Sequence, residues 1–223
     1  LLNASELAFK TKDYSKAVEL YTRLEKEAEI SNHKTTAHLG NMRSHFFLNN
    51  FDTAIVYARK VLENNKNTNI TIDEARYIIA KSAISLNNTK LGLEEFDKLK
   101  KSKNGEFSGE ANYVFAYNSY TNKKYSEAEK MILSYSSNPS SEYWLAKLII
   151  LLGDIYVENN KTLMAKQTYQ SIVDNYEGEE LVKIAQEKID AILAKENEKL
   201  KILEDITLDA KQDVDEVIIS TGK

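Results

Sequence analysis

The sequence predicts an all-α fold made of helix pairs stacked in series, and three observations support this. A short pattern, an aromatic or small residue followed by a helical spacer and a small residue, recurs five times along the chain. Glycine and proline, which interrupt helices, number only 7 and 1 among 223 residues. Apolar residues recur at spacings of three and four, as in Leu148, Leu152 and Ile155. We therefore expect helices throughout and no β-sheet.

The central small residue of each copy, which we call the pivot, is evenly spaced. The clearest copies are Tyr14-Ser15-Lys16-Ala17, Phe51-Asp52-Thr53-Ala54 and Tyr125-Ser126-Glu127-Ala128. The five pivots lie 37, 38, 36 and 37 residues apart, at Ala17, Ala54, Gly92, Ala128 and Ala165. A period of this size, with two amphipathic helices in each unit, is typical of a solenoid in which each unit packs mainly on its neighbours.

The repeat pattern and its turns set the expected element boundaries. We expect a solenoid over residues 1–204, with units at about 1–30, 33–65, 71–102, 107–136 and 140–176 and a capping helix at 179–204. Within the units the expected helices are 2–11 and 13–30, 33–49 and 51–65, 71–87 and 89–102, 107–122 and 124–136, and 140–159 and 161–176. The acidic tail at 205–223 is expected to be flexible.

Asparagine pairs mark the bends between partner helices. Asn49-Asn50, Asn87-Asn88 and Asn159-Asn160 each fall where one helix should end and the next begin. Asparagine tolerates positive φ, so we expect left-handed backbone there. Gly178 is expected to end a helix in the same conformation.

Small residues upstream of the pivots, where paired helices can approach closely, complete a recognisable pattern. The best copy is Leu152-Gly153-Asp154-Ile155-Tyr156 followed by Ala165 and Tyr169, and with the other copies it resembles the tetratricopeptide repeat (TPR) family over about residues 1 to 195. In the second repeat, at residues 33–65, Met42 and His45 replace the small pair, which departs from the family pattern.

The resemblance implies a right-handed α-α superhelix of five helix pairs plus the capping helix, acting as a non-enzymatic scaffold that binds a protein or peptide. The longer units look most similar to bacterial cell-envelope members of the family, of the type associated with outer-membrane assembly and Tol–Pal systems. That similarity implies a periplasmic or outer-membrane-associated location. Because the chain begins Leu1-Leu2 without methionine, we expect it to be a processed form or part of a longer polypeptide.

Composition and motifs argue against several classes of function. A net charge of −4 with mixed signs does not favour a nucleic-acid partner. The longest apolar stretch, from Leu145 to Gly153, is too short to span a bilayer. No nucleophile elbow, phosphate-binding glycine loop or dinucleotide fingerprint is present, so we expect no catalysis, no small-molecule substrate and no cofactor.

Three histidines are the only candidates for a metal site, and their spacing does not favour one. His38 and His45 lie seven residues apart, whereas a helical zinc pair is usually four apart. We therefore expect no metal. His45 is expected to fill a helix interface, with His33 and His38 solvated.

The first helix of each unit is expected to line the concave side of the superhelix, where a partner segment would bind. Tyrosine buries a large area at little entropic cost and retains a hydroxyl group, which suits peptide recognition. The candidate groove residues are Arg43, Phe46, Tyr77, Lys81, Tyr113, Tyr117, Tyr120 and Asp154. The open alternative is that the three tyrosines from Tyr113 to Tyr120 pack on neighbouring helices instead.

Two hypotheses of function remain from the sequence. The first is partner binding in the groove, although not as a clamp for acidic chain termini, since the equivalent stripe of Glu6, Arg43, Lys81, Tyr117 and Asp154 lacks the full cationic and amide set that such clamps use in the family. The second is a structural or oligomerisation segment whose contacts are made by the repeat ends or the tail. This includes a homodimer formed through the C-terminal helix.

Overall fold

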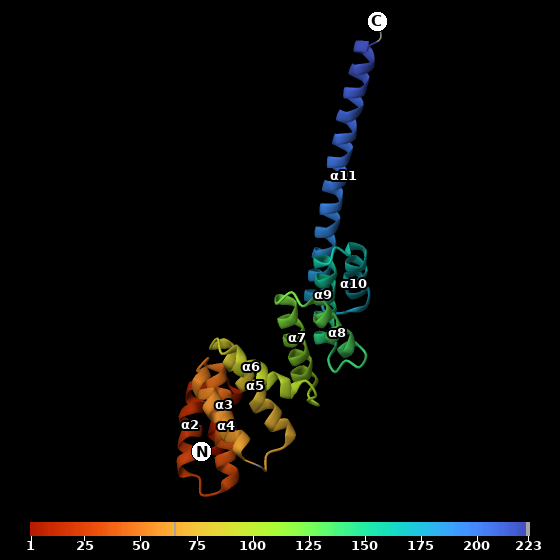
Figure 1. Ribbon diagram of the computed structural model, residues 1–223. Coiled ribbons are helices and arrows are strands. Elements are labelled where there is room, and N and C mark those ends of the chain that lie inside the picture. The colour runs from red at the N-terminus through yellow and green to blue at the C-terminus, as the bar shows by residue number, and fades with distance from the viewer. Residues whose placement is uncertain (65, 222–223) are drawn as a thin grey trace. The chain divides into compact units, whose positions relative to one another are not determined.

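The computed structural model describes residues 1–64 and 66–221, apart from the side chains of Asp205 and of residues 208–221. Over this part of the chain it contains α-helices and no β-strand (Figure 1). The helices are α1 (Leu2–Lys10), α2 (Tyr14–Glu27), α3 (Ser31–Phe47), α4 (Phe51–Glu63), α5 (Asn69–Ser85), α6 (Thr89–Leu99), α7 (Gly105–Thr121), α8 (Tyr125–Ser136), α9 (Glu142–Glu158), α10 (Thr162–Asn175) and α11 (Glu179–Thr221).

The ten paired helices begin and end within three residues of the bounds expected from the sequence. The last helix is longer than expected, because α11 continues to Thr221 instead of ending at residue 204. The side chains of the predicted flexible tail lie largely outside the described residues, so its flexibility stays a prediction.

Two compact units make up the chain, Leu1–Leu145 and Ala146–Lys223. In the first unit, each helix from α1 to α7 packs on the next one along the chain. The odd-numbered helices also touch one another, α1 with α3, α3 with α5 and α5 with α7, whereas the described even-numbered helices do not. The odd helices therefore form the more tightly spaced layer, which is the layer toward which such a stack curves.

The bends inside the five hairpins share one backbone conformation. Positive φ occurs at Lys12, Asn49, Asn87, Lys123 and Asn160, with values between 57° and 62°. Each of these residues lies five positions before a pivot, so the backbone dihedral angles repeat with the same period as the sequence pattern. The expectation for the asparagine pairs is confirmed, with one asparagine of each pair in the left-handed region. The expectation for Gly178 is wrong, because the described glycines all have negative or extended φ.

The pivots form the contact between the two helices of each pair. Ala17, Ala54, Ala128 and Ala165 are fully buried, since only a small side chain fits where two helix backbones approach. One turn further along, a large residue fills the space beside the pivot, as Phe96 does in α6 and Ile132 in α8. The alternation of small and large residues explains why the repeat is visible in the sequence.

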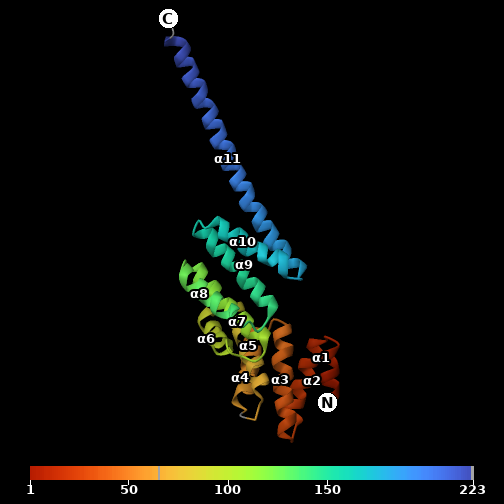
Figure 2. The same ribbon diagram turned by 90° about the vertical axis from the view of Figure 1, so that its right-hand side faces the viewer.

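The second unit contains most of α9, with α10 and α11. A Cβ atom on Gly153 would lie 2.2 Å from the buried ring of Tyr169, so only glycine allows α10 to approach α9 this closely. Figures 1 and 2 show α11 as one continuous helix that runs well past α10. Among the side chains of α11 that are described, the buried apolar ones are Leu181, Ala185, Ile189 and Ile192, all in the first third of the helix.

Candidate functional site

Helices α5, α6 and α7 surround an open, mainly apolar pocket of about 400 Å³, which we call the tyrosine pocket. Tyr113 and Tyr117 reach it from α7, and Lys81 and Ile84 reach it from α5. The full lining is Lys81, Ile84, Ser85, Thr89, Leu93, Phe96, Glu110, Tyr113, Val114, Tyr117, Asn118 and Thr121. Three of the residues proposed from the sequence as groove residues therefore line a single pocket.

The tyrosines of α7 form a continuous row of rings. Tyr113 and Tyr117 are stacked, with ring centroids 5.8 Å apart and planes 15° apart. Tyr120 continues the row at 6.2 Å from Tyr117, and the Trp144 ring lies 5.5 Å from Tyr113 at the other end. Within this row Tyr117 is 46% exposed, so it presents ring surface to solvent while the stack holds its position.

Glu110 closes one edge of the tyrosine pocket by accepting hydrogen bonds from two residues of α5. The Tyr77 hydroxyl donates to one carboxylate oxygen at 2.6 Å, and Lys81 Nζ donates to the other at 2.5 Å. The Tyr77 ring stacks on Phe107 at 4.5 Å. Burial, reinforced by the Glu110 carboxylate, raises the pKa of the Tyr77 hydroxyl well above its usual range. These two groove candidates thus have partners within the chain.

Arg43 and Phe46, on α3, also contact other parts of the first unit. The Arg43 guanidinium donates to both carboxylate oxygens of Glu74 on α5, at 2.5 and 2.6 Å. The hydrogen bond to Glu74 raises the pKa of Arg43. Phe46 is half-buried and packs edge-on against Phe51 with centroids 6.1 Å apart. Both residues therefore help to join helices to one another.

Asp154 belongs to the second unit, where it has two partners. Lys188 Nζ donates to Asp154 Oδ1 at 2.6 Å, and the Tyr169 hydroxyl donates to the same oxygen at 2.6 Å. This carboxylate joins α9 to both α10 and α11. The sequence alone showed it only as an acidic position on the expected groove stripe.

The histidines differ partly from expectation. His45 is half-buried and stacked on the Tyr57 ring at 5.7 Å, and burial lowers its pKa, so its prediction as an interface residue is confirmed. The expectation of a solvated His38 is wrong, because its Nε2 lies 3.0 Å from Glu25 Oε1 and its side chain is largely covered. Among the described residues, His, Cys, Asp and Glu form no cluster that would hold a metal ion.

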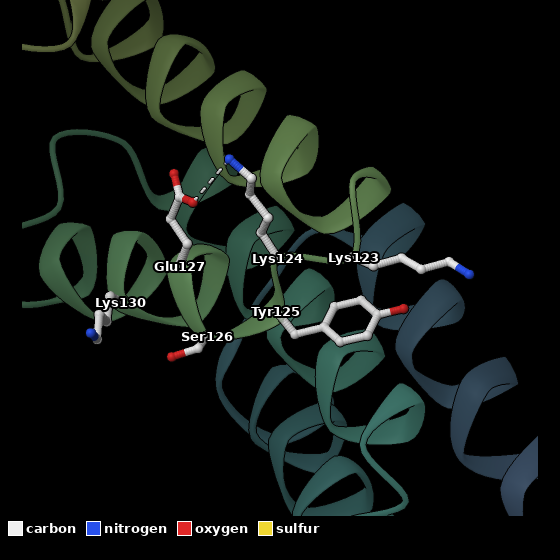
Figure 3. A pocket seen from close by; sticks show the side chains of 6 residues that line it. All are labelled: Lys123, Lys124, Tyr125, Ser126, Glu127 and Lys130. Carbon is white, nitrogen blue, oxygen red and sulfur yellow. Dashed lines mark ion pairs between the residues drawn. The ribbon is translucent and has the colours of Figure 1, made fainter.

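A second, shallower pocket of about 510 Å³ lies at the start of α8 and is lined by Lys123, Lys124, Tyr125, Ser126, Glu127 and Lys130. Figure 3 shows that the lysine side chains diverge, with Lys123 and Lys130 on opposite sides. Lys124 is paired with Glu127 at 3.6 Å. Since the cations do not converge on a common point, this surface does not form a preorganised anion site.

The sequence did not predict the carboxylates that pair with the groove cations, Glu74 and Glu110, or two of the apolar residues that line the tyrosine pocket, Leu93 and Val114. Glu74 and Glu110 lie 31 and 29 residues from the cations they pair with, and this separation becomes meaningful only when consecutive odd helices are placed side by side. Leu93 and Val114 carried no signal beyond ordinary helical spacing. The TPR register did locate Tyr113 and Tyr117.

No family model and no curated protein matches the chain. Several solved structures, however, resemble it. The apo form of RapI superposes with a TM-score of 0.65 at 15% identity, over 81% of this chain and 55% of RapI, so the chain spans little more than half of that protein. The C-terminal part of a TPR repeat-containing protein from Cytophaga hutchinsonii gives 0.61 at 13% identity, over 87% of this chain and 80% of that one. The fold is that of a TPR solenoid.

YrrB, described as a TPR protein with an unusual peptide-binding site, gives a TM-score of 0.57 at 16% identity, over 83% of this chain and 90% of YrrB. At these identities the likeness establishes the fold, and the predicted fold class is confirmed. Within the described residues, no helix combines the length and apolar character needed to cross a membrane.

Proposed function

We propose that this chain is a non-enzymatic protein-interaction scaffold that holds a peptide or an extended protein segment against its odd-numbered helices, with the tyrosine pocket as the principal contact. The observation that carries this proposal is the exposure of Tyr117 above an open apolar pocket. A tyrosine that is 46% exposed yet fixed by a neighbouring ring offers binding area without a large entropic cost.

The lining of the pocket favours an apolar or aromatic side chain of the partner. Its walls are carbon-rich, with Ile84, Leu93 and Val114 beside the two rings. Its charged residues, Lys81 and Glu110, are paired with each other, so neither favours a further charged partner strongly. A volume of about 400 Å³ is within the usual range for ligand pockets and accommodates one large side chain with part of its backbone.

The structural neighbours agree with this class of function. YrrB is described as having a peptide-binding site, and it shares the fold over 83% of this chain. The cell-envelope setting, periplasmic or outer-membrane-associated, rests on the sequence resemblance alone and is part of the proposal. Fractionation of native cells with an antibody to this chain tests that setting, and recovery in the cytoplasmic fraction would contradict it.

A second candidate function is oligomerisation through the C-terminal helix. The observation that favours it is a run of exposed apolar residues on α11, which includes Leu200, Leu203 and Ile206 at 57%, 57% and 58% exposure. The two functions use different surfaces and are compatible with each other.

Panning a phage-displayed library of random peptides against the chain tests groove binding without requiring the natural partner. We expect enriched peptides to carry an aromatic or large aliphatic residue, and Tyr117→Ala to weaken their binding about tenfold or more, as loss of a central aromatic contact does. Leu133→Ala on α8 is the matched control, because Leu133 is also half-exposed at 52% and lies outside the pocket. Equal losses in both variants, or no loss in Tyr117→Ala, would contradict the proposal.

A further inference from the structure

Helix α11 consists of a covered part and an uncovered part. In the covered part, Lys188 pairs with Asp154 of α9, and Glu196 pairs with Lys166 of α10 at 2.7 Å. Because Lys166 lies in the first turns of α10, its contact with Glu196 marks the point on α11 beyond which α10 no longer lies alongside. Beyond Glu196, the described side chains of α11 form no hydrogen bond or ion pair with another helix.

The face that packs on the rest of the second unit continues past this point. At about 100° per residue, Leu200 and Leu203 lie on the same side of the helix as Ile189 and Ile192. Ile189 and Ile192 are 6% and 7% exposed, whereas Leu200 and Leu203 are each 57% exposed. One apolar stripe is thus buried at Ile189 and Ile192 and open at Leu200 and Leu203.

The spacing of the open stripe is that of a two-stranded coiled coil. Leu200 and Thr207 are seven residues apart, and Leu203 lies three residues after Leu200, as the a and d positions require. One heptad earlier the d position is Glu196, which pairs with Lys166 of α10, so the open repeat begins at Leu200. The sequence carries the same spacing forward with Ala210, Val214 and Val217, and the helical backbone continues to Thr221.

Opposite charges flank the stripe. Lys199 precedes Leu200 on one side, at a g position, and Glu204 follows Leu203 on the other side, at an e position. When two such helices run in parallel around a two-fold axis, the g residue of one faces the following e residue of the other. Lys199 of each copy would then face Glu204 of its partner, giving two symmetric attractive pairs.

We propose, building on the oligomerisation function proposed above, that α11 from Leu200 onward forms a parallel two-stranded coiled coil with a second copy of this chain. The occupant is a second copy because the stripe is self-complementary in both its apolar spacing and its flanking charges. A lone helix with an apolar stripe in water has little to stabilise it beyond its own hydrogen bonds. This dimer is independent of peptide binding in the tyrosine pocket, and it would present two such pockets in one assembly.

Sedimentation equilibrium over a range of concentrations tests the proposal. We expect the full chain to associate to a dimer, and the double variant Leu200→Lys/Leu203→Lys to weaken association more than tenfold. The matched control is Ile202→Lys, because Ile202 is similarly exposed at 52% but occupies a c position, outside the a and d seam. A monomeric wild-type chain, or a control that dissociates as fully as the double variant, would overturn the proposal.

A charge exchange tests the parallel arrangement. Lys199→Glu and Glu204→Lys should each weaken the dimer, because each places like charges opposite one another, and the combined exchange should restore it. Because the sequence contains no cysteine, Leu203→Cys adds a single thiol, which should form an intermolecular disulfide under mild oxidation, whereas Ile202→Cys should not. Failure of the combined exchange to restore association would exclude this register.

Discussion

Tyr77 and Tyr117 come from the same predicted groove stripe, yet the structure gives them different surroundings. Tyr77 on α5 donates its hydroxyl to buried Glu110 and stacks on Phe107. Tyr117 on α7 stacks on a neighbouring tyrosine and presents nearly half of its surface to solvent above a pocket. The comparison shows that an aromatic residue on the layer of odd-numbered helices joins helices where the next odd helix supplies a carboxylate, and is exposed to solvent where a pocket lies beside it.

The largest expected effect comes from removing the residue that fixes Tyr77. Glu110 is only 8% exposed and accepts hydrogen bonds from two residues, so Glu110→Ala leaves a partly buried hydroxyl and an ammonium group without their acceptor. We expect a loss of about 2–3 kcal/mol in the free energy of unfolding, measured by urea denaturation. A loss below that of Glu94→Ala, at an exposed acid on α6, would show that the contact is not structural.

A similar loss is expected from enlarging a pivot on the helix that pairs with α7. Ala128 on α8 is fully buried against α7, so Ala128→Leu forces the two helices apart. We expect about 1–3 kcal/mol of destabilisation in chemical denaturation, and the same for Ala165→Leu in the second unit. Unchanged stability in both variants would mean that the pivots do not set the helix spacing.

The matched hydroxyl deletions sharpen the comparison itself. Tyr77→Phe removes one hydrogen bond to a carboxylate and should cost about 1–2 kcal/mol in the free energy of unfolding. Tyr117→Phe leaves the ring stack intact and should change stability by less than about 0.5 kcal/mol, as is usual for exposed positions. Thermal melts of the two variants side by side provide the measurement, and equal shifts would contradict the distinction.

His45 provides the smallest expected effect, through pH. Because burial lowers its pKa in the folded chain, the unfolded chain binds a proton first as the pH falls through 6.5. Stability contributed by the neutral imidazole is therefore present above that pH and is lost as the pH falls toward the lowered value. We expect the free energy of unfolding to fall by less than about 1 kcal/mol over this pH interval because of His45. Urea denaturation of the wild-type chain and of His45→Gln at several pH values should show that this contribution is missing in the variant. A stability that increases over this interval would reverse the assigned sign.

The sequence predicted the fold because the repeat consists of residues that pack locally. Pivots such as Ala54 and Ala128 contact the other helix of the same hairpin, and Asn49 and Asn87 adopt the backbone that the turn requires. These constraints act within about twenty residues, roughly half of one repeat, so spacing alone exposes them.

The sequence predicted the candidate site less completely because its contacts cross from one hairpin to the next. The register placed Arg43, Tyr77 and Lys81 on the layer of odd-numbered helices but did not reveal that Glu74 and Glu110 pair with their polar groups. Whether a side chain on that layer is paired depends on the residue opposite it on the next odd helix. A one-dimensional pattern does not contain that information.

Hydrogen exchange with and without a library-selected peptide tests the central claim most directly, because it locates the bound segment without altering the chain. We predict added protection in α5 near Lys81 and Ile84 and in α7 from Tyr113 to Thr121, with α2 and α4 unchanged. Protection confined to the even-numbered helices, or to α11, would contradict the proposal that the tyrosine pocket binds the peptide.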